Sequence, residues 1–248
     1  RAAEREELVV ELQPIVELDT GNVAAAEALV RWNHPEHGRM TPGEFIDVAE
    51  ETGRILEVDR FVMERACFLA AGWAPGPGGP LGLHVNVSPR ELQRPELIAR
   101  VSDALETTGL SPSQLVLEIT ESGLMRDPRA VLGRLQALRE LGVRLAIDDF
   151  GTGYSSLSCL RWMPIDVLKM AKSFVDDLVG VQRHTALAGT IAGLSRTLGM
   201  TTVAEGIESR EQADILDDLR CELGQGFLFS PPLHPERFSA LLPTRSAA

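Results

Sequence analysis

The chain has 248 residues, of which 44% are hydrophobic and 24% are charged, and its formal net charge at pH 7 is −12. This apolar content is ordinary for a globular protein and excludes a disulfide-stapled miniprotein, a coiled coil and a disordered tail. The acidic balance argues against DNA or RNA as partners, because binding nucleic acid requires dense lysine and arginine to displace counterions.

Short apolar runs predict eight strands in chain order, at residues 8–12, 25–31, 81–87, 115–119, 143–147, 167–170, 201–204 and, more weakly, 226–229. Helical signatures lie between them. Thr41, Pro42 and Glu44 form a capping box with proline in the first turn. Further helices are expected to begin near Ser88, Asp127, Arg183 and Ser209.

Strands that alternate with helices indicate parallel βαβ units, and at this length an irregular α/β barrel of the (β/α)8 TIM type fits best. A doubly wound sheet is the alternative. The turn-like residues 19–22 are too few for a crossover helix, so the first two strands are predicted to pair antiparallel.

The N-terminal residues lack the pattern of a signal peptide, and the longest uncharged stretch, residues 66–89, is interrupted by prolines. We therefore expect a cytoplasmic domain, either free or as the cytoplasmic part of a membrane-anchored parent. Residues 1–7 resemble the end of a linker helix, and residues 8–248 are expected to form a single domain. Cys67, Cys159 and Cys221 are expected as reduced core thiols.

Polar side chains gather where the predicted strands end, at Glu27, Asn86, Glu118, Glu121, Asp148, Asp149, Lys169, Glu205, Glu208 and Gln225. The carboxyl ends of barrel strands form one mouth, so these side chains should converge there. Converging carboxylates repel one another and require raised pKa values or divalent cations. Oxygen ligands favour Mg²⁺, Mn²⁺ or Ca²⁺ over Zn²⁺. The adjacent Asp148 and Asp149 are typical of paired cations in phosphoryl chemistry.

Residues 27–29, Glu-Ala-Leu, resemble the signature of the EAL domain family of cyclic-di-GMP phosphodiesterases. The resemblance continues in order along nearly the whole chain, at residues 13–16, 85–88, 118–121, 148–157, 168–169, 173–175, 204–208 and 225–227. It implies an EAL-type barrel that hydrolyses cyclic-di-GMP to linear 5′-pGpG and lowers the level of this second messenger.

The resemblance also implies a role for each site residue. Mg²⁺ or Mn²⁺ would be bound by Glu27, Asn86, Glu118, Asp148 and Asp149, with Ca²⁺ inhibitory. Lys169 and Glu205 would act on the attacking water, and Gln225 would position water or metal. The dinucleotide would contact Gln13, Leu29 and Arg31. Glu121 and Glu208 would hold the loop of residues 150–157. A homodimer, and attachment to sensor or GGDEF domains in a longer parent, are implied in the same way.

One departure from the family pattern bears on activity. Residues 169–175 read Lys-Met-Ala-Lys-Ser-Phe-Val, where the family usually has aspartate in third place, so Ala171 removes one ligand of the second metal. The first hypothesis is a metal-dependent phosphodiesterase whose activity is reduced by Ala171. The alternative is a catalytically weakened cyclic-di-GMP receptor. A third, more distant hypothesis is a metabolic barrel enzyme acting on another phosphorylated substrate.

Five scattered histidines are expected to be structural or solvated: His34, His37, His84, His184 and His234.

Overall fold

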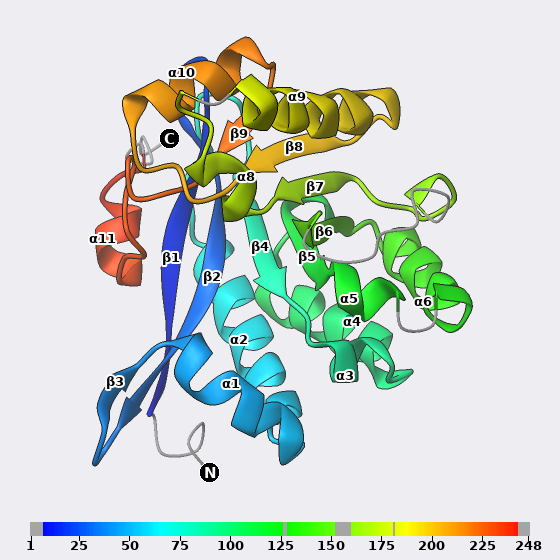
Figure 1. The fold of residues 1–248 in the computed structure, drawn as a ribbon. Coiled ribbons are helices and arrows are strands. Elements are labelled where there is room, and N and C mark those ends of the chain that lie inside the picture. The colour runs from blue at the N-terminus through cyan, green and yellow to red at the C-terminus, as the bar shows by residue number, and fades with distance from the viewer. Residues whose placement is uncertain (1–6, 126–127, 152–159, 181, 243–248) are drawn as a thin grey trace.

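The computed structural model describes residues 7–125, 128–151, 160–180 and 182–242 (Figure 1). Eight strands close into a barrel: β1 (Leu8–Glu17), β2 (Val23–His34), β4 (Gly82–Asn86), β5 (Leu115–Thr120), β6 (Arg144–Phe150), β7 (Val167–Met170), β8 (Thr201–Ala204) and β9 (Leu223–Gly224). The short β3 (Gly38–Met40) extends β2 beyond the barrel as a hairpin.

The strand directions confirm the prediction of an irregular α/β barrel. β1 pairs antiparallel with β2 on one side and with β9 on the other, and the remaining barrel strands pair in parallel. The turn between β1 and β2 is short, as expected for an antiparallel hairpin. β1 therefore closes the barrel by joining the first and last parts of the chain.

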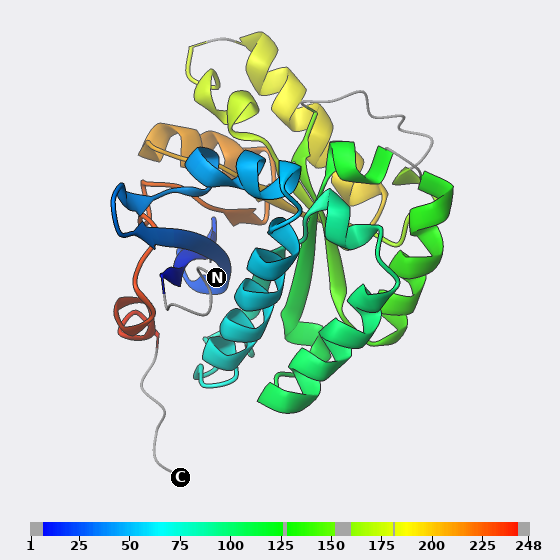
Figure 2. The same ribbon diagram turned by 90° about the horizontal axis from the view of Figure 1, so that it is seen from below.

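Helices surround the strands, as Figures 1 and 2 show. They are α1 (Pro42–Glu51), α2 (Ile55–Ala70), α3 (Pro89–Leu92), α4 (Glu96–Thr108), α5 (Glu121–Met125), α6 (Pro128–Glu140), α8 (Lys172–Asp176), α9 (Gln182–Thr197), α10 (Arg210–Asp218) and α11 (Pro235–Ser239), with a 3₁₀ turn at Pro112–Gln114. α2 packs on β4, α6 on β6, α9 on β7 and β8, and α11 on β1. No described helix is long and apolar enough to cross a membrane.

Local signals account for several helix starts. Thr41 and Glu44 form the expected capping box at α1, and Ser209 forms another with Gln212 at α10. Ser88 caps α3 by accepting a hydrogen bond from the Glu91 amide at 3.1 Å. The helix expected after Ser88 is divided into α3 and α4, with residues 93–95 between them. The long α2 and the short β3 were not predicted.

The predicted position of the eighth strand, residues 226–229, was wrong, because the strand begins three residues earlier. The strand is β9, at Leu223 and Gly224, and residues 226–229 form a turn. The turn arises because Gly226 lies against the backbone of Ile207, where an added Cβ would come within 2.1 Å of the carbonyl oxygen. Ile207 donates to the Gln225 carbonyl and accepts from the Leu228 amide, so the chain curls around it.

Two apolar layers hold the barrel. The larger lies between the strands and the helices and includes the free, buried Cys67 and Cys221; Cys159 lies outside the described residues. The smaller fills the barrel interior, where Leu223 packs against six buried residues: Ile15, Ala25, Val116, Ala146, Val167 and Val203. This interior layer is the floor beneath the strand ends.

A half-buried carboxyl group on α2 couples folding to pH. Asp59 accepts a hydrogen bond of 2.5 Å from the Ser88 hydroxyl, which joins α2 to the start of α3. Burial raises the pKa of Asp59 from its ordinary 3.8 to about 7; hydrogen bonds from Ser88 oppose the rise and the charge of Glu91 adds to it. The folded state therefore binds this proton more tightly than the unfolded chain does.

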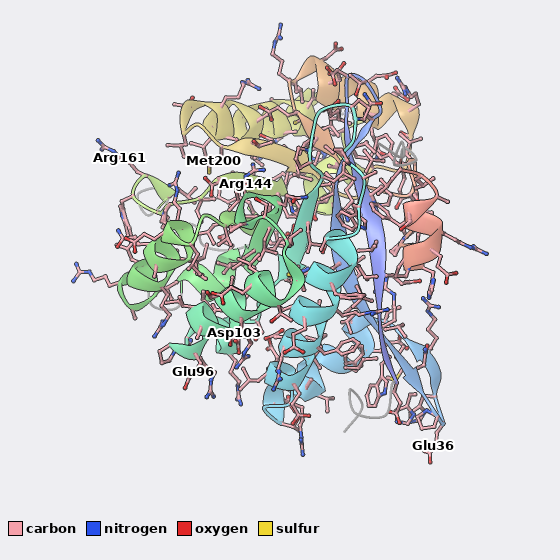
Figure 3. All side chains as sticks on the ribbon, turned by 180° about the vertical axis from the view of Figure 1, so that it is seen from behind. Glu36, Glu96, Asp103, Arg144, Arg161 and Met200 are labelled. Atoms are coloured by element: carbon pink, nitrogen blue, oxygen red, sulfur yellow. The ribbon has the colours of Figure 1, made fainter. Side chains whose placement is uncertain are left out.

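We predict that Asp59→Asn stabilises the protein increasingly as pH rises. The wild type loses stability between about pH 4 and pH 7, because the folded pKa lies above the unfolded one, and the loss reaches up to about 4 kcal/mol. The melting temperature of the variant should match that of the wild type near pH 4 and exceed it above pH 7. Asp103→Asn, at an exposed site on α4 (Figure 3), is the control. A difference that does not change with pH would contradict the assignment.

Candidate functional site

The site lies one step above the apolar floor of the barrel. Successive residues of a strand point to opposite faces, so residues two apart share a face. Two residues beyond the floor positions, toward the mouth, the inward side chains are Gln13, Glu27, Glu118, Asp148, Lys169, Glu205 and Gln225. On β4, Asn86 likewise lies two residues beyond the buried His84, toward the mouth. The polar ring thus follows from the alternation of the strands.

Lys169 is the centre of this ring. Its side chain is 1% exposed, and its Nζ lies 2.7 Å from Glu118 Oε2, 2.7 Å from Glu205 Oε1, 3.2 Å from Asp148 Oδ1 and 3.4 Å from Glu27 Oε2. The four carboxylates come from β2, β5, β6 and the end of β8. A buried ammonium of this kind is stable only when it is paired.

The charges in the ring shift one another's proton affinities. Burial lowers the pKa of Lys169, but the carboxylates of Asp148, Glu118 and Glu205 outweigh burial and raise it well above the ordinary value. Burial raises the pKa of Glu205 to about 8, although the Lys169 ammonium opposes the rise. Burial and the charge of Glu27 raise the pKa of Glu118 well above its usual range. The pKa values of Lys169, Glu205 and Glu118 are therefore all raised within the ring.

Glu27 is held in place by two amides. The Asn86 Nδ2 donates to Glu27 Oε1 at 2.8 Å, and the Gln225 Nε2 donates to Glu27 Oε2 at 2.8 Å. Gln225 also donates to Gln13 Oε1 at 3.0 Å. Burial alone would raise the pKa of Glu27, but Lys169 and these two hydrogen bonds outweigh it and lower the pKa. The surroundings of Glu27 thus favour its ionised form.

The paired aspartates lie where β6 becomes irregular. The β6–β7 register shifts between Ile147 and Phe150, and Asp149 has φ +53°, which is uncommon for a residue other than glycine. Asp148 Oδ1 is buried and, beyond its ion pair with Lys169, has no hydrogen-bond partner among the described residues, while Asp149 is exposed. Burial and the neighbouring charge of Asp148 raise the pKa of Asp149. The strand end therefore bends so that two successive carboxylates stay close.

The donor set suits a hard cation in its chemistry. All of its ligating atoms are carboxylate or amide oxygens, which Mg²⁺ and Mn²⁺ prefer, and Asp148 Oδ1 is a buried acceptor that receives no hydrogen bond from the described residues. Among the described residues, no group of three or more His, Cys, Asp or Glu side chains is arranged to hold a metal ion. One oxygen each of Glu27, Glu118, Asp148 and Glu205 faces Lys169 Nζ instead.

Sequence reasoning did not connect His84 to the site. This histidine is 2% exposed, and its Nδ1 lies 2.7 Å from Glu118 Oε1, opposite the oxygen that Lys169 holds. Burial and the charge of Lys169 lower the pKa of His84 to about 3, so the imidazole is neutral. The available signal was its spacing, two residues before Asn86 on the same face of β4.

A cavity of about 270 Å³ opens above the ring. Its described lining residues are Gln13, Glu27, Leu29, Lys172, Glu205, Gly206, Glu208, Gln225, Gly226 and Phe227. Gln13 and Leu29, which were predicted to contact a dinucleotide, are among them. Arg31 is not: its Nε lies 2.8 Å from Glu11 Oε2, within β1 and β2. Phe227, which is 67% exposed, was not singled out from the sequence.

The two residues predicted to anchor a loop have different partners. Glu121 is buried and accepts a hydrogen bond from the Gly151 amide at 2.8 Å, at the start of the predicted loop. Glu208 Oε1 lies 2.7 Å from Lys172 Nζ. Residues 152–157 of that loop lie outside the described residues. The structure thus shows Glu121 next to the beginning of the loop and Glu208 at the cavity.

Ala171 lies between β7 and α8. It is 2% exposed and occupies the N-cap position of α8, without a side-chain hydrogen bond to the helix. An aspartate at this position would supply both a helix cap and a carboxylate two residues after Lys169. The methyl group supplies neither.

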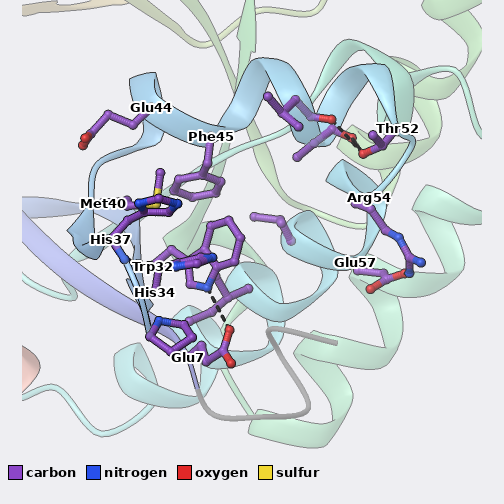
Figure 4. Close-up of a pocket in the computed structure, with 15 residues that line it drawn as sticks. Glu7, Trp32, His34, His37, Met40, Glu44, Phe45, Thr52, Arg54 and Glu57 are labelled. Carbon is purple, nitrogen blue, oxygen red and sulfur yellow. Dashed lines mark hydrogen bonds and ion pairs between the residues drawn. The ribbon is translucent and has the colours of Figure 1, made fainter.

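A second, larger cavity lies elsewhere. It measures about 550 Å³ and is bounded by Trp32, Phe45, Met40 and Arg54, among others (Figure 4). Trp32 follows Leu29 by three residues along β2, and residues an odd number apart in a strand point to opposite faces, so these two side chains do so. The described residues that line this cavity include none of the strand-end residues, so it is separate from the acidic ring.

Comparison with known proteins identifies the family. A profile of the EAL domain matches residues 1–232, and the chain belongs to the EAL domain family. The chain is 41% identical over 255 residues to the cyclic di-GMP phosphodiesterase NbdA of Pseudomonas aeruginosa. The match covers 99% of this chain and 33% of NbdA. The chain is also 40% identical over 240 residues to MucR of the same organism, which is named a bifunctional diguanylate cyclase/cyclic di-GMP phosphodiesterase. That match covers 97% of this chain and 35% of MucR.

The fold has close counterparts among solved structures. The phosphodiesterase of MucR in complex with c-di-GMP superimposes with a TM-score of 0.90 at 40% identity, covering 96% of each chain. The chain spans about a third of the length of the NbdA and MucR proteins. The structure therefore corresponds to one part of such longer proteins.

We predict that Lys169→Met lowers the unfolding free energy by about 3–5 kcal/mol in metal-free buffer, because it leaves buried carboxylates unpaired. Millimolar Mg²⁺ should recover part of the loss. Urea denaturation with and without Mg²⁺ measures both effects. Lys172→Met removes the other, exposed lysine and should cost less than about 1 kcal/mol. Equal stability of the two variants would show that Lys169 does not hold the ring together.

Proposed function

We propose that this site hydrolyses one phosphodiester bond of cyclic-di-GMP and releases linear 5′-pGpG. The observation that supports this most is the ring of four carboxylates around Lys169 beneath an open cavity. The names of NbdA and MucR support the same substrate.

The residues that would hold Mg²⁺ or Mn²⁺ are Glu27, Asn86, Glu118, Asp148 and Asp149. A divalent ion at this position supplies Lewis acidity toward the phosphate and lowers the pKa of a bound water. Ca²⁺, which tolerates looser coordination, is expected to permit binding while inhibiting turnover.

The chain's own groups serve the displacement at phosphorus. The water oxygen forms a bond to phosphorus, the bond to the 3′ oxygen breaks, and the leaving oxygen takes a proton. Glu205 lines the cavity and lies 2.7 Å from Lys169 Nζ, and its ionised form is the proposed proton acceptor for the water. Lys169 orients the water and offsets negative charge in the transition state. Gln225 donates to Glu27 Oε2 and to Gln13 Oε1, and so holds Glu27 in place.

The second candidate function is a cyclic-di-GMP receptor with little turnover. The observation that favours it is Ala171, a buried methyl group where a carboxylate would complete a second cation site. Such a receptor would keep the cavity and the ring but lose the second cation. Lys169, Glu205 and Glu27 are all present in one cluster, which favours the enzyme.

The wider setting is part of the same proposal. We expect a homodimer formed through the region of residues 150–157 and attachment to sensor or GGDEF domains of a longer cytoplasmic or membrane-anchored parent. DNA and RNA are not expected as partners, since the chain is strongly acidic.

We predict that the purified protein with Mn²⁺ converts cyclic-di-GMP to pGpG, measured chromatographically, and that Ala171→Asp raises the rate about 10–100-fold by restoring a ligand. Replacing Mn²⁺ with Ca²⁺ should suppress turnover in both proteins. Turnover by the Asp variant alone would identify a receptor built on a phosphodiesterase fold. Absence of pGpG with both proteins would contradict the enzymatic proposal.

A further inference from the structure

The phosphates of the proposed ligand would be repelled by the carboxylates that line the cavity. A cyclic dinucleotide carries two phosphodiester anions. The chain has a net charge of −12, and the cavity is lined by Glu27, Glu205 and Glu208. Placing phosphates beside these carboxylates requires a cation to offset the repulsion.

Two basic side chains near the cavity already face carboxylates of the protein. Arg31 lies against Glu11, at 2.8 Å, with its side chain 10% exposed. Lys169 is 1% exposed and surrounded by the ring. Both are paired with carboxylates of the protein, and neither is among the described residues that line the cavity.

Lys172 is the one basic side chain among the described residues that line the cavity. It is the first residue of α8, and its side chain is 49% exposed. Its Nζ lies 2.7 Å from Glu208 Oε1 and 2.6 Å from Asp176 Oδ1. The ammonium is therefore solvent-accessible at the cavity wall while its two partners hold it there.

The stem of Lys172 is held by a close backbone approach. A Cβ added to Gly206 would lie within 2.4 Å of Lys172 Cγ, and Gly206 has φ +72°, so both the contact and the conformation require glycine. The two carboxylate partners are themselves about half exposed, and such pairs contribute little to stability. Exchanging one of them for a phosphate oxygen costs the protein little. Ala171, the residue before Lys172, has no carboxylate that would compete with a ligand for the Lys172 ammonium.

We propose that Lys172 is a substrate-binding residue that donates a charge-assisted hydrogen bond to a phosphodiester oxygen of the bound cyclic dinucleotide. This role rests on the proposed function, since it takes the cyclic dinucleotide as the ligand of the cavity. Of the two lysines in the whole sequence, Lys169 then holds the carboxylate ring and Lys172 meets the ligand.

The presence of only two lysines makes a direct test possible. The folded protein is acetylated with an amine-selective reagent in Ca²⁺, with and without cyclic-di-GMP, and the labelled peptides are quantified by mass spectrometry. Saturating ligand should slow acetylation of Lys172 at least about tenfold, a protection equivalent to one good contact. Lys169 should be labelled only after denaturation. An unchanged labelling rate at Lys172 under saturating ligand would overturn the proposal.

Binding of cyclic-di-GMP by variants, measured by calorimetry in Ca²⁺, separates this inference from the proposed function. Lys172→Gln should weaken the affinity at least about tenfold, and Lys172→Arg should retain most of it. Arg60→Gln is the matched control, because Arg60 is exposed and paired with a carboxylate four residues on, outside this cavity. Wild-type affinity in Lys172→Gln overturns the role of Lys172 and leaves the proposed function standing. Absence of binding by the wild type overturns both.

Discussion

The structure depends on the pairing of one buried ammonium with carboxylates from four strand positions around the barrel. Removing Lys169 or any one of these acids from water is costly, and their mutual contact, with the hydrogen bonds to Glu27 and the contact of His84 with Glu118, offsets the cost. Because strand side chains alternate, a slip of one residue in β2, β5 or β6 would turn its acid out of the barrel and leave the ammonium unpaired. The charge cluster therefore fixes the strand register as firmly as the apolar floor beneath it.

Much of this arrangement could be predicted from the sequence, because it repeats one local rule. Polar residues at the ends of short apolar strands predicted the mouth and the acids that meet there, and the alternation of strands with helices predicted the barrel. The eighth strand escaped the rule because β9 has two residues and is defined by its neighbours Val16 and Ala204. The pairing of Arg31 with Glu11, and of His84 with Glu118, depends on contacts between strands that periodicity does not encode.

The two lysines divide the site into regions of different character. Lys169 is the last charged residue of β7 and is closed off from solvent, whereas Lys172 begins α8 and faces the cavity. Between them Ala171 contributes neither charge nor helix cap. A negatively charged ligand in the cavity would thus meet the carboxylate ring below it and, among the described lining residues, one accessible ammonium at its side, so charge as well as shape would set its orientation.

The hydrogen bonds of Gln225 determine when the site can assemble during synthesis of the chain. This side chain holds Glu27 and Gln13, which lie 198 and 212 positions earlier in the chain. Contacts at such separations form late, because a long stretch of chain must be ordered before its ends can meet. During synthesis, Glu27 therefore leaves the ribosome long before the residue that orients it. The barrel can be closed by β1, and the site completed, only when translation has passed residue 225.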